Sequence, residues 1–176
     1  MHELVYKLLL PEFNEIKLDS YTVPVQFPDD YGYITHRTRN IIKPEFVTIN
    51  GVYFNDTLMF FKGNGRKGLI HRDKSSMWGI NWVSGGHCLM EYWDDYTNFR
   101  EFIKTDISGN VVIMVETNDP PTRVYVLSEG AWLINATVAH RASGTKNRCV
   151  HSLRTTALLG NGMWEDIIAH YSNLIE

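Results

Sequence analysis

The sequence predicts a mainly β protein, a β-sandwich or jelly roll, with α-helical content in flanking helices and at the C-terminal end. From residue 57 onward, short runs rich in β-branched and aromatic residues follow one another at the regular spacing typical of such folds. We expect strands at 57–61, 68–74, 77–83, 87–93, 111–116, 122–127, 132–142 and 148–159. Apolar residues then recur with helical spacing between 163 and 175, which predicts an amphipathic helix that packs on the sheet.

Turns rich in glycine, asparagine and proline separate the expected strands. They are Gly63-Asn64-Gly65, Ser84-Gly85-Gly86, Asn118-Asp119-Pro120-Pro121 and Ser143-Gly144-Thr145-Lys146-Asn147. Residues 96–104 fit either a short helix or an irregular insert. Because no repeat or linker interrupts the pattern, we expect one domain over residues 1–176, with a lead-in at 1–56, a core at 57–159 and the C-terminal helix at 160–176.

Composition and charge narrow the function classes. The chain is 44% hydrophobic, enough for a real core, and its net charge is -3. There is no overall basic signal for nucleic acid, which is therefore a disfavoured partner, and no apolar run long enough to cross a membrane. The N-terminus lacks the pattern of a signal peptide, and Cys88 and Cys149 are too few for a disulfide framework. We expect a cytoplasmic protein with two reduced thiols.

The pair His71 and Asp73 is the most informative motif. Side chains alternate along a strand, so His-x-Asp places an imidazole and a carboxylate on the same side. His140, from a distant strand, would complete a set of two imidazoles and one carboxylate. That set suits non-heme Fe(II) in oxygen-activating enzymes, although Mn(II) and Zn(II) accept the same ligands. On their own, His71 and Asp73 also fit an ordinary exposed strand end.

The order of these residues resembles that of the Fe(II)- and 2-oxoglutarate-dependent oxygenases. Their double-stranded β-helix carries His-x-Asp, then a long gap, a second His and, shortly afterwards, an Arg. Here that order reads His71-Arg72-Asp73, His140 and Arg148. The runs at 79–82 and 130–136 look like the strands that this family places behind and before its metal site. The resemblance covers roughly residues 57–159 and implies a jelly roll with His71, Asp73 and His140 as metal ligands.

In that family an Arg holds the far carboxylate of 2-oxoglutarate, because a planar guanidinium forms a fork with a carboxylate. The resemblance favours Arg148 for this role. Arg154 is the alternative, since both lie on the same face of the expected strand. Asn81 is a further candidate to contact the co-substrate, with Met59 and Phe61 as possible lining. His151 points to the opposite face by parity, so we do not expect it to be a ligand.

The resemblance implies a dioxygenase that uses Fe(II), O2 and 2-oxoglutarate, releases succinate and carbon dioxide, and hydroxylates its substrate. Halogenating relatives have a small residue where Asp73 stands, so this carboxylate favours hydroxylation. The substrate would be a small molecule or an amino-acid side chain, free or in a peptide, and the sequence does not identify it.

Two other readings stay open. A cupin-like metal enzyme, such as an isomerase or hydrolase, would use the same three ligands without Arg148. A non-enzymatic β-sandwich binding protein would carry His71 and His140 incidentally. Succinate release from 2-oxoglutarate separates the oxygenase from the first, and stoichiometric metal binding separates both enzymes from the second.

Overall fold

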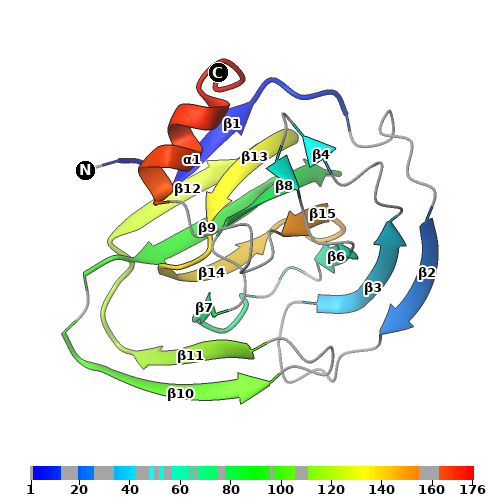
Figure 1. Cartoon of the computed structure of the whole chain (residues 1–176). Helices are drawn as coiled ribbons and strands as arrows, with labels where there is room; N and C mark the ends of the chain where they lie inside the picture. The colour runs from blue at the N-terminus through cyan, green and yellow to red at the C-terminus, as the bar shows by residue number, and fades with distance from the viewer. Residues whose placement is uncertain are drawn as a thin grey trace.

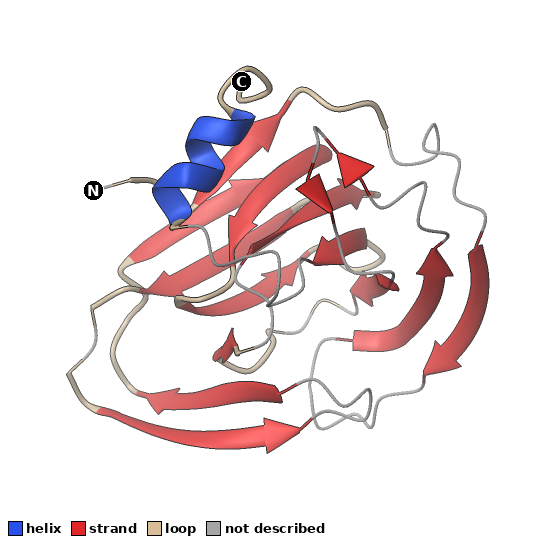
Figure 2. Ribbon diagram, viewed as in Figure 1, coloured by secondary structure: helices blue, strands red, loops and turns tan. Residues whose placement is uncertain are grey.

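In the computed structural model, two antiparallel sheets face one another and a single helix lies at the C-terminal end (Figures 1 and 2). The chain is thus mainly β, as predicted, and its two sheets are consistent with a β-sandwich. The structure describes residues 2–12, 20–25, 34–42, 48–49, 52–53, 57–63, 65, 67–74, 78–95, 97–105, 111–154 and 163–176.

The larger sheet has seven strands in the order β1-β13-β8-β15-β6-β3-β2. Its members are β1 (Val5–Leu8), β2 (Ser20–Val25), β3 (Ile34–Ile42), β6 (Thr57–Gly63), β8 (Trp78–Ser84), β13 (Gly130–Asn135) and β15 (Cys149–Arg154). The N-terminal lead-in is therefore not set apart from the core, because β1 pairs with β13 and β3 pairs with β6.

The smaller sheet has six strands in the order β10-β11-β7-β14-β9-β12. Its members are β7 (His71–Asp73), β9 (Cys88–Trp93), β10 (Phe99–Thr105), β11 (Val111–Thr117), β12 (Arg123–Leu127) and β14 (Ala139–Gly144). Two short strands, β4 (Thr48–Ile49) and β5 (Val52–Tyr53), form a separate pair.

Eight of these strands pair in a nested way. β9 pairs with β12, β8 with β13, β7 with β14 and β6 with β15, all antiparallel. Successive pairs alternate between the six-stranded and the seven-stranded sheet. The chain therefore runs as one long hairpin ribbon that folds over from one sheet to the other.

The core between the sheets is drawn from both inner faces. Met90, Tyr92 and Leu127 come from the six-stranded sheet, and Val83 and Val150 from the seven-stranded sheet, in one buried cluster. Because strand side chains alternate, the neighbours of these residues point outward. This shared cluster fixes which side chains of each strand face the interior.

The outer face of the seven-stranded sheet is covered by α1 (Trp164–Tyr171). Tyr171 is fully buried and meets the ring of Trp78 edge-on, with 5.6 Å between centroids. Glu165 and Asp166 lie in the first turn of the helix, where their charges favour the positive end of its dipole. The helix is shorter than the periodicity predicted, because the chain turns at Ser172 and Ile175 then bridges to Leu8.

Two local expectations were wrong. Residues 99–105 form strand β10 and not a helix or an irregular insert, because they pair with β11 along their whole length. The expected single strand at 132–142 is two strands in different sheets. The side chain of Asn135 accepts hydrogen bonds from the N–H and hydroxyl of Thr137, and this turn ends β13.

In the described part of the chain, no helix has the length and apolar character that a bilayer span requires. Cys88 and Cys149 are both free thiols, as expected.

Candidate functional site

Strands β7 and β14 bring the two predicted histidines together. His140 is the cross-strand partner of His71, and their ring centroids are 4.6 Å apart with the planes tilted by 49°. β7 is only three residues long, but the chain around it is held by backbone hydrogen bonds from Gly68 to Ala142 and from Asp73 to Ala136. The register of the sheet therefore sets the position of both imidazoles.

Both rings are oriented by the backbone. Nδ1 of His71 lies 3.0 Å from the carbonyl oxygen of Leu69, and Nδ1 of His140 lies 2.8 Å from that of Val138. A carbonyl can only accept, so each contact favours the tautomer with its proton on Nδ1. The lone pair then belongs to Nε2 of each ring, and this arrangement is common for histidines that bind a metal ion.

Asp73 lies on the same strand and the same face as His71. Its Oδ1 is 3.9 Å from His71 Nε2, whereas neighbouring ligands of an octahedral ion with bonds of about 2.1 Å stand about 3 Å apart. Among the residues that the structure describes, no three His, Cys, Asp or Glu side chains are close enough together to hold one metal ion. The strands thus gather the three residues, while the side chains are more open than a bound ion requires.

The site opens toward one side. His140 is 3% exposed and Tyr92, whose ring lies 5.7 Å from that of His140, is fully buried. The side chains of His71 and Asp73 are 22% and 16% exposed. Solvent therefore reaches the pair from the β7 side, and the β9 side is closed.

Arg148 is the second unusual group in the interior. Its residue is only 2% exposed, its Nε donates to the carbonyl oxygen of Ser143 at 3.1 Å, and no carboxylate of the described residues pairs with it. A buried cation without an anion is costly, because it gives up its hydration without a counter-charge. Its charge partly opposes the burial that raises the pKa of the nearby Cys88 thiol.

Gly144 makes room for this guanidinium. A Cβ at position 144 would clash first with the backbone oxygen of His87 and would stand 2.8 Å from Nε of Arg148, and the backbone there has a φ of 143°, which L side chains rarely adopt. Gly144 follows His140 by four residues on β14, so Arg148 lies beside the same inner face about 13 Å from His140. Between them stands Ala142, which packs against the buried cluster that includes Met90 and Val150.

The opposite wall carries unpaired polar atoms. Asn81 and Ser152 are cross-strand neighbours on β8 and β15, 7% and 0% exposed. Asn81 Oδ1 and Ser152 Oγ have no hydrogen-bond partner among the described residues. β14 and β15 are joined by one turn, and His140 and Ser152 lie at similar distances along the chain from that turn. Ser152 and Asn81 are therefore at about the level of the histidine pair. Buried polar groups are normally paired, and their exceptions call for a ligand or water.

The remaining candidates are placed less fully. Arg154 ends β15 in register with Gly79, and Met59 and Phe61 lie on β6, but the side chains of all three are outside the described residues. His151 is in register with Trp82 on the outer face, so its predicted direction is confirmed. Burial there lowers its pKa to about 4.

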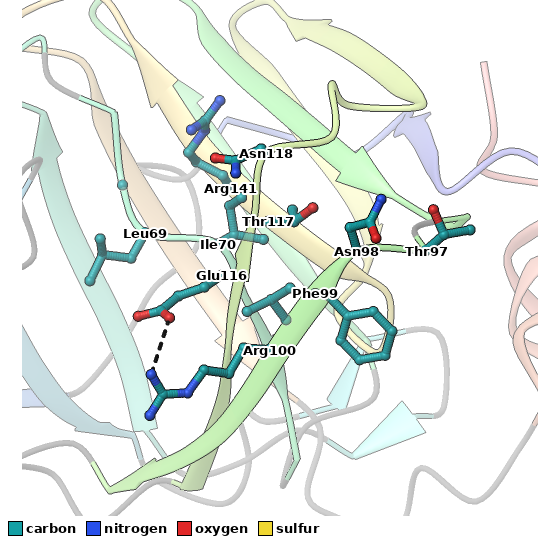
Figure 3. A pocket seen from close by; sticks show the side chains of 12 residues that line it. Leu69, Ile70, Thr97, Asn98, Phe99, Arg100, Glu116, Thr117, Asn118 and Arg141 are labelled. Carbon is teal, nitrogen blue, oxygen red and sulfur yellow. Dashed lines mark ion pairs between the residues drawn. The ribbon is translucent and has the colours of Figure 1, made fainter.

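A groove of about 790 Å³ lies on the other face of β7 and β14 (Figure 3). Ile70 and Arg141, the sequence neighbours of the two histidines, line it together with Phe99 of β10. Arg141 donates two hydrogen bonds to Glu91, which lowers the pKa of that carboxyl, and its guanidinium lies over the ring of Trp93. The groove and the histidine pair are therefore separated by the sheet itself.

The sequence analysis did not single out Tyr92 or Met114, which flank the histidines in the same row of the sheet. Tyr92 belongs to the alternating inward positions of β9 with Cys88 and Met90, so period two was the signal that would have placed it inside. Met114 has no such sequence signal, because its apolar strand reads alike on both faces.

No protein-family model and no curated protein matches the chain. Among solved structures it is similar to the crystal structure of hydroquinone 1,2-dioxygenase PnpCD in complex with Cd2+ and 4-hydroxybenzonitrile, at 14% identity and a TM-score of 0.37. The match covers 62% of this chain and 63% of that chain, and we draw nothing about activity from it.

Proposed function

We propose that this chain is an Fe(II)- and 2-oxoglutarate-dependent dioxygenase that hydroxylates a small molecule or an amino-acid side chain. The observation that carries the proposal is one inner face of β14. It presents His140 beside His71 and Asp73 at one end, and at the other the buried Arg148, which pairs with no carboxylate of the described residues. A metal chelator that also bears a distant carboxylate is the kind of ligand that would satisfy both ends.

The strand order supports a jelly roll of the double-stranded β-helix type as the scaffold. A jelly roll is a hairpin ribbon wound across two sheets, and the nested pairs from β9/β12 out to β6/β15 have that form. In this ribbon β7 and β14 are neighbours, so residues far apart in the sequence reach one site.

His71, Asp73 and His140 would hold the metal ion. Two neutral imidazoles and one carboxylate leave coordination positions open for other ligands, and this donor set suits Fe(II). The backbone carbonyls of Leu69 and Val138 keep the rings in the required tautomer. Binding would draw the Asp73 carboxylate toward His71 Nε2 from its present 3.9 Å. Bound iron would supply the activation of dioxygen, which side chains alone cannot perform.

Arg148 would hold the far carboxylate of 2-oxoglutarate. Of the roughly 13 Å of β14 between His140 and Gly144, the metal ligands occupy one end and the guanidinium the other. The carbon chain of the ligand would pass over Ala142, the small residue between them on this face. The hydroxyl of Ser152 and the amide Nδ2 of Asn81 on the facing wall would donate to the same ligand, whose ionised carboxylates and keto group only accept. Arg154 remains the alternative clamp.

The carboxylate of Asp73 favours hydroxylation over halogenation, because it fills the coordination position that a halide would need. The buried Arg148, with no carboxylate partner in the part of the chain that the structure describes, favours 2-oxoglutarate dependence over a cupin-like reaction that uses only the three metal ligands. The two free thiols are compatible with a reducing compartment such as the cytoplasm.

The test is metal and co-substrate binding, which needs no knowledge of the substrate. We expect one equivalent of Mn(II) to bind, as measured by the loss of the EPR signal of the free ion. We expect calorimetry to show that 2-oxoglutarate binds only to the metal-loaded protein. His71→Ala and Asp73→Ala should each abolish metal binding. His87→Ala is the matched control, since His87 is an exposed residue of the β8–β9 turn. Unchanged metal binding in His71→Ala and Asp73→Ala would remove the assignment.

A further inference from the structure

The row of cross-strand partners that contains the two histidines extends to strand β10 at the edge of the sheet. Phe102 is the cross-strand partner of Met114, Met114 of His71, and His71 of His140. Direct partners point to the same face of a sheet, so Phe102 shares the inner face with the histidines. Two strand spacings separate Phe102 from His71, about 10 Å.

Exposure along this row marks an approach to the site. Met114 is 4% exposed, whereas Phe102 at the sheet edge is 38% exposed. The side chains of His71 and Asp73 are open on this same side. A large aromatic face left uncovered next to a partly open polar site is typical of a surface that meets a ligand.

The neighbours of Phe102 on this face are cations. Arg100 places its guanidinium 5.9 Å from the ring centroid, and Lys104 lies in register with Val112 and, beyond it, Asp73. Arg100 pairs with Glu116 at 3.8 Å at the rim that these two residues share with the outer groove (Figure 3), and both side chains are largely exposed, so this ion pair is weak and easily exchanged for a ligand anion. The strand thus offers a ring face between two positive charges.

We propose that the inner face of β10 is the substrate platform of this site and that the substrate carries a planar ring with an anionic group. The ring would lie on Phe102, and its anion would meet Arg100 or Lys104. Aromatic carboxylates and nucleoside monophosphates share this chemistry. The proposal rests on the proposed function for the site that the substrate enters.

Phe99 provides a matched control on the same strand. It is 49% exposed, but it lies in register with Thr117 on the opposite face and lines the outer groove (Figure 3). Replacing Phe99 or Phe102 by alanine removes a partly exposed ring from the same strand in each case. Only Phe102 should affect a ligand on the inner face.

The experiment uses Zn(II)-loaded protein, which does not catalyse the reaction, and 2-oxoglutarate is added at saturation so that Arg148 is occupied. Benzoate, adenosine monophosphate, cyclohexanecarboxylate and benzyl alcohol are titrated by saturation-transfer NMR against wild type, Phe102→Ala, Phe102→Leu and Phe99→Ala. We expect benzoate or adenosine monophosphate to bind more tightly than the non-planar acid and the neutral alcohol. Binding should weaken about three- to tenfold in both Phe102 variants, as expected for a lost ring contact. Phe99→Ala should bind the probes as wild type does. Whichever of benzoate and adenosine monophosphate binds more tightly shows whether the substrate is an aromatic carboxylate or a nucleoside monophosphate.

Equal binding in wild type and Phe102→Ala would overturn the platform, as would equal affinity for benzoate and cyclohexanecarboxylate or no saturable binding of any probe. The affinity for 2-oxoglutarate is measured in the same proteins and should not change in Phe102→Ala. If 2-oxoglutarate binds and the probes do not depend on Phe102, the platform alone is wrong. If the probes depend on Phe102 and 2-oxoglutarate does not bind, the proposed function alone is wrong.

Discussion

The two faces of strand β8 differ in the hydrogen bonding of their buried polar side chains. On the outer face, Trp82 is buried beside Ile80 under the C-terminal helix, and its indole N–H donates to the carbonyl oxygen of Pro11. On the inner face, Asn81 is almost as buried, yet its Oδ1 has no partner among the described residues. One face of the strand therefore carries large apolar side chains packed under the helix, and the other carries a buried amide.

The same contrast separates the helix-covered region from the space between His140 and Arg148. Packing explains the first region, where apolar side chains fill the volume and the indole N–H of Trp164 also reaches a backbone carbonyl. Packing does not explain Arg148, because a methionine of similar length would fill that place without a buried charge. The second region is therefore the one in which we propose that a ligand binds.

The largest expected effect is on turnover in His140→Ala. The second imidazole is lost, so metal binding and succinate formation from 2-oxoglutarate should fall below detection. The thermal midpoint should also fall, because the ring is 3% exposed and its removal leaves a cavity beside Tyr92. Succinate is measured by mass spectrometry, and activity above a tenth of wild type would contradict the metal role.

Arg148→Met should separate stability from function. We expect the affinity for 2-oxoglutarate to fall about 100-fold, the loss of a charge-assisted pair, while metal binding is kept. The unliganded protein should melt at the same temperature or higher, because a buried charge that no described carboxylate neutralises is removed. Calorimetry and thermal melts are compared, with Arg154→Met in parallel. If only Arg154→Met weakens 2-oxoglutarate, the clamp is Arg154.

Leu133→Ala tests the helix-covered region in the opposite sense. Leu133 is fully buried in the cluster under the helix, so we expect a loss of about 2–5 kcal/mol in unfolding free energy. The variant that remains folded at low temperature should bind 2-oxoglutarate as wild type does. Urea denaturation gives the first value, and a large drop in affinity would show that the two regions are not independent.

The buried His151 should make stability depend on pH. Burial lowers its pKa in the folded protein to about 4 from the ordinary 6.5, so the unfolded chain binds the proton more readily between these values. Its contribution is therefore fully present above about pH 6.5 and is lost as pH falls toward 4. Thermal melts from pH 7 to 4 should show a smaller fall in His151→Gln than in wild type. An identical pH profile in both proteins would contradict the burial effect.

The smallest effect belongs to Ser152→Ala. Because its hydroxyl has no partner among the described residues, its removal should leave the unliganded protein within about 1 kcal/mol of wild type or slightly more stable. A decrease in 2-oxoglutarate affinity of a few-fold would sharpen the assignment of this wall. Destabilisation by more than 2 kcal/mol would instead make the serine a structural group.

The sequence predicted strands such as β9, β11 and β12, which are short runs of apolar, β-branched and aromatic residues close to turn signals. It missed β10, where charged residues are interspersed with Phe99 and Ile103, and this segment was taken for a helix or an insert. The apolar run at 132–142 hid the change of sheet after β13, although Asn135 before Thr137 is a turn signal. Edge strands such as β1 depend on a distant partner, which no local pattern reveals.

For the site, the alternation of side chains along a strand was enough to predict that His71 and Asp73 share one face and that His151 points to the opposite face of its strand. The pairing of His71 with His140 depends on sheet register, and only the resemblance to a family suggested it. The burial of Arg148 beside Gly144 and the open side chains of His71 and Asp73 are properties of packing, so no sequence pattern could supply them.

The most direct test of the account is an anaerobic titration of the Fe(II)-loaded protein with 2-oxoglutarate, followed in the visible spectrum. The account predicts a weak charge-transfer band that saturates at one equivalent, disappears in His140→Ala and needs much more co-substrate in Arg148→Met. Iron bound without any such band would contradict 2-oxoglutarate dependence and favour the cupin-like reaction, and no iron bound at all would leave a binding protein.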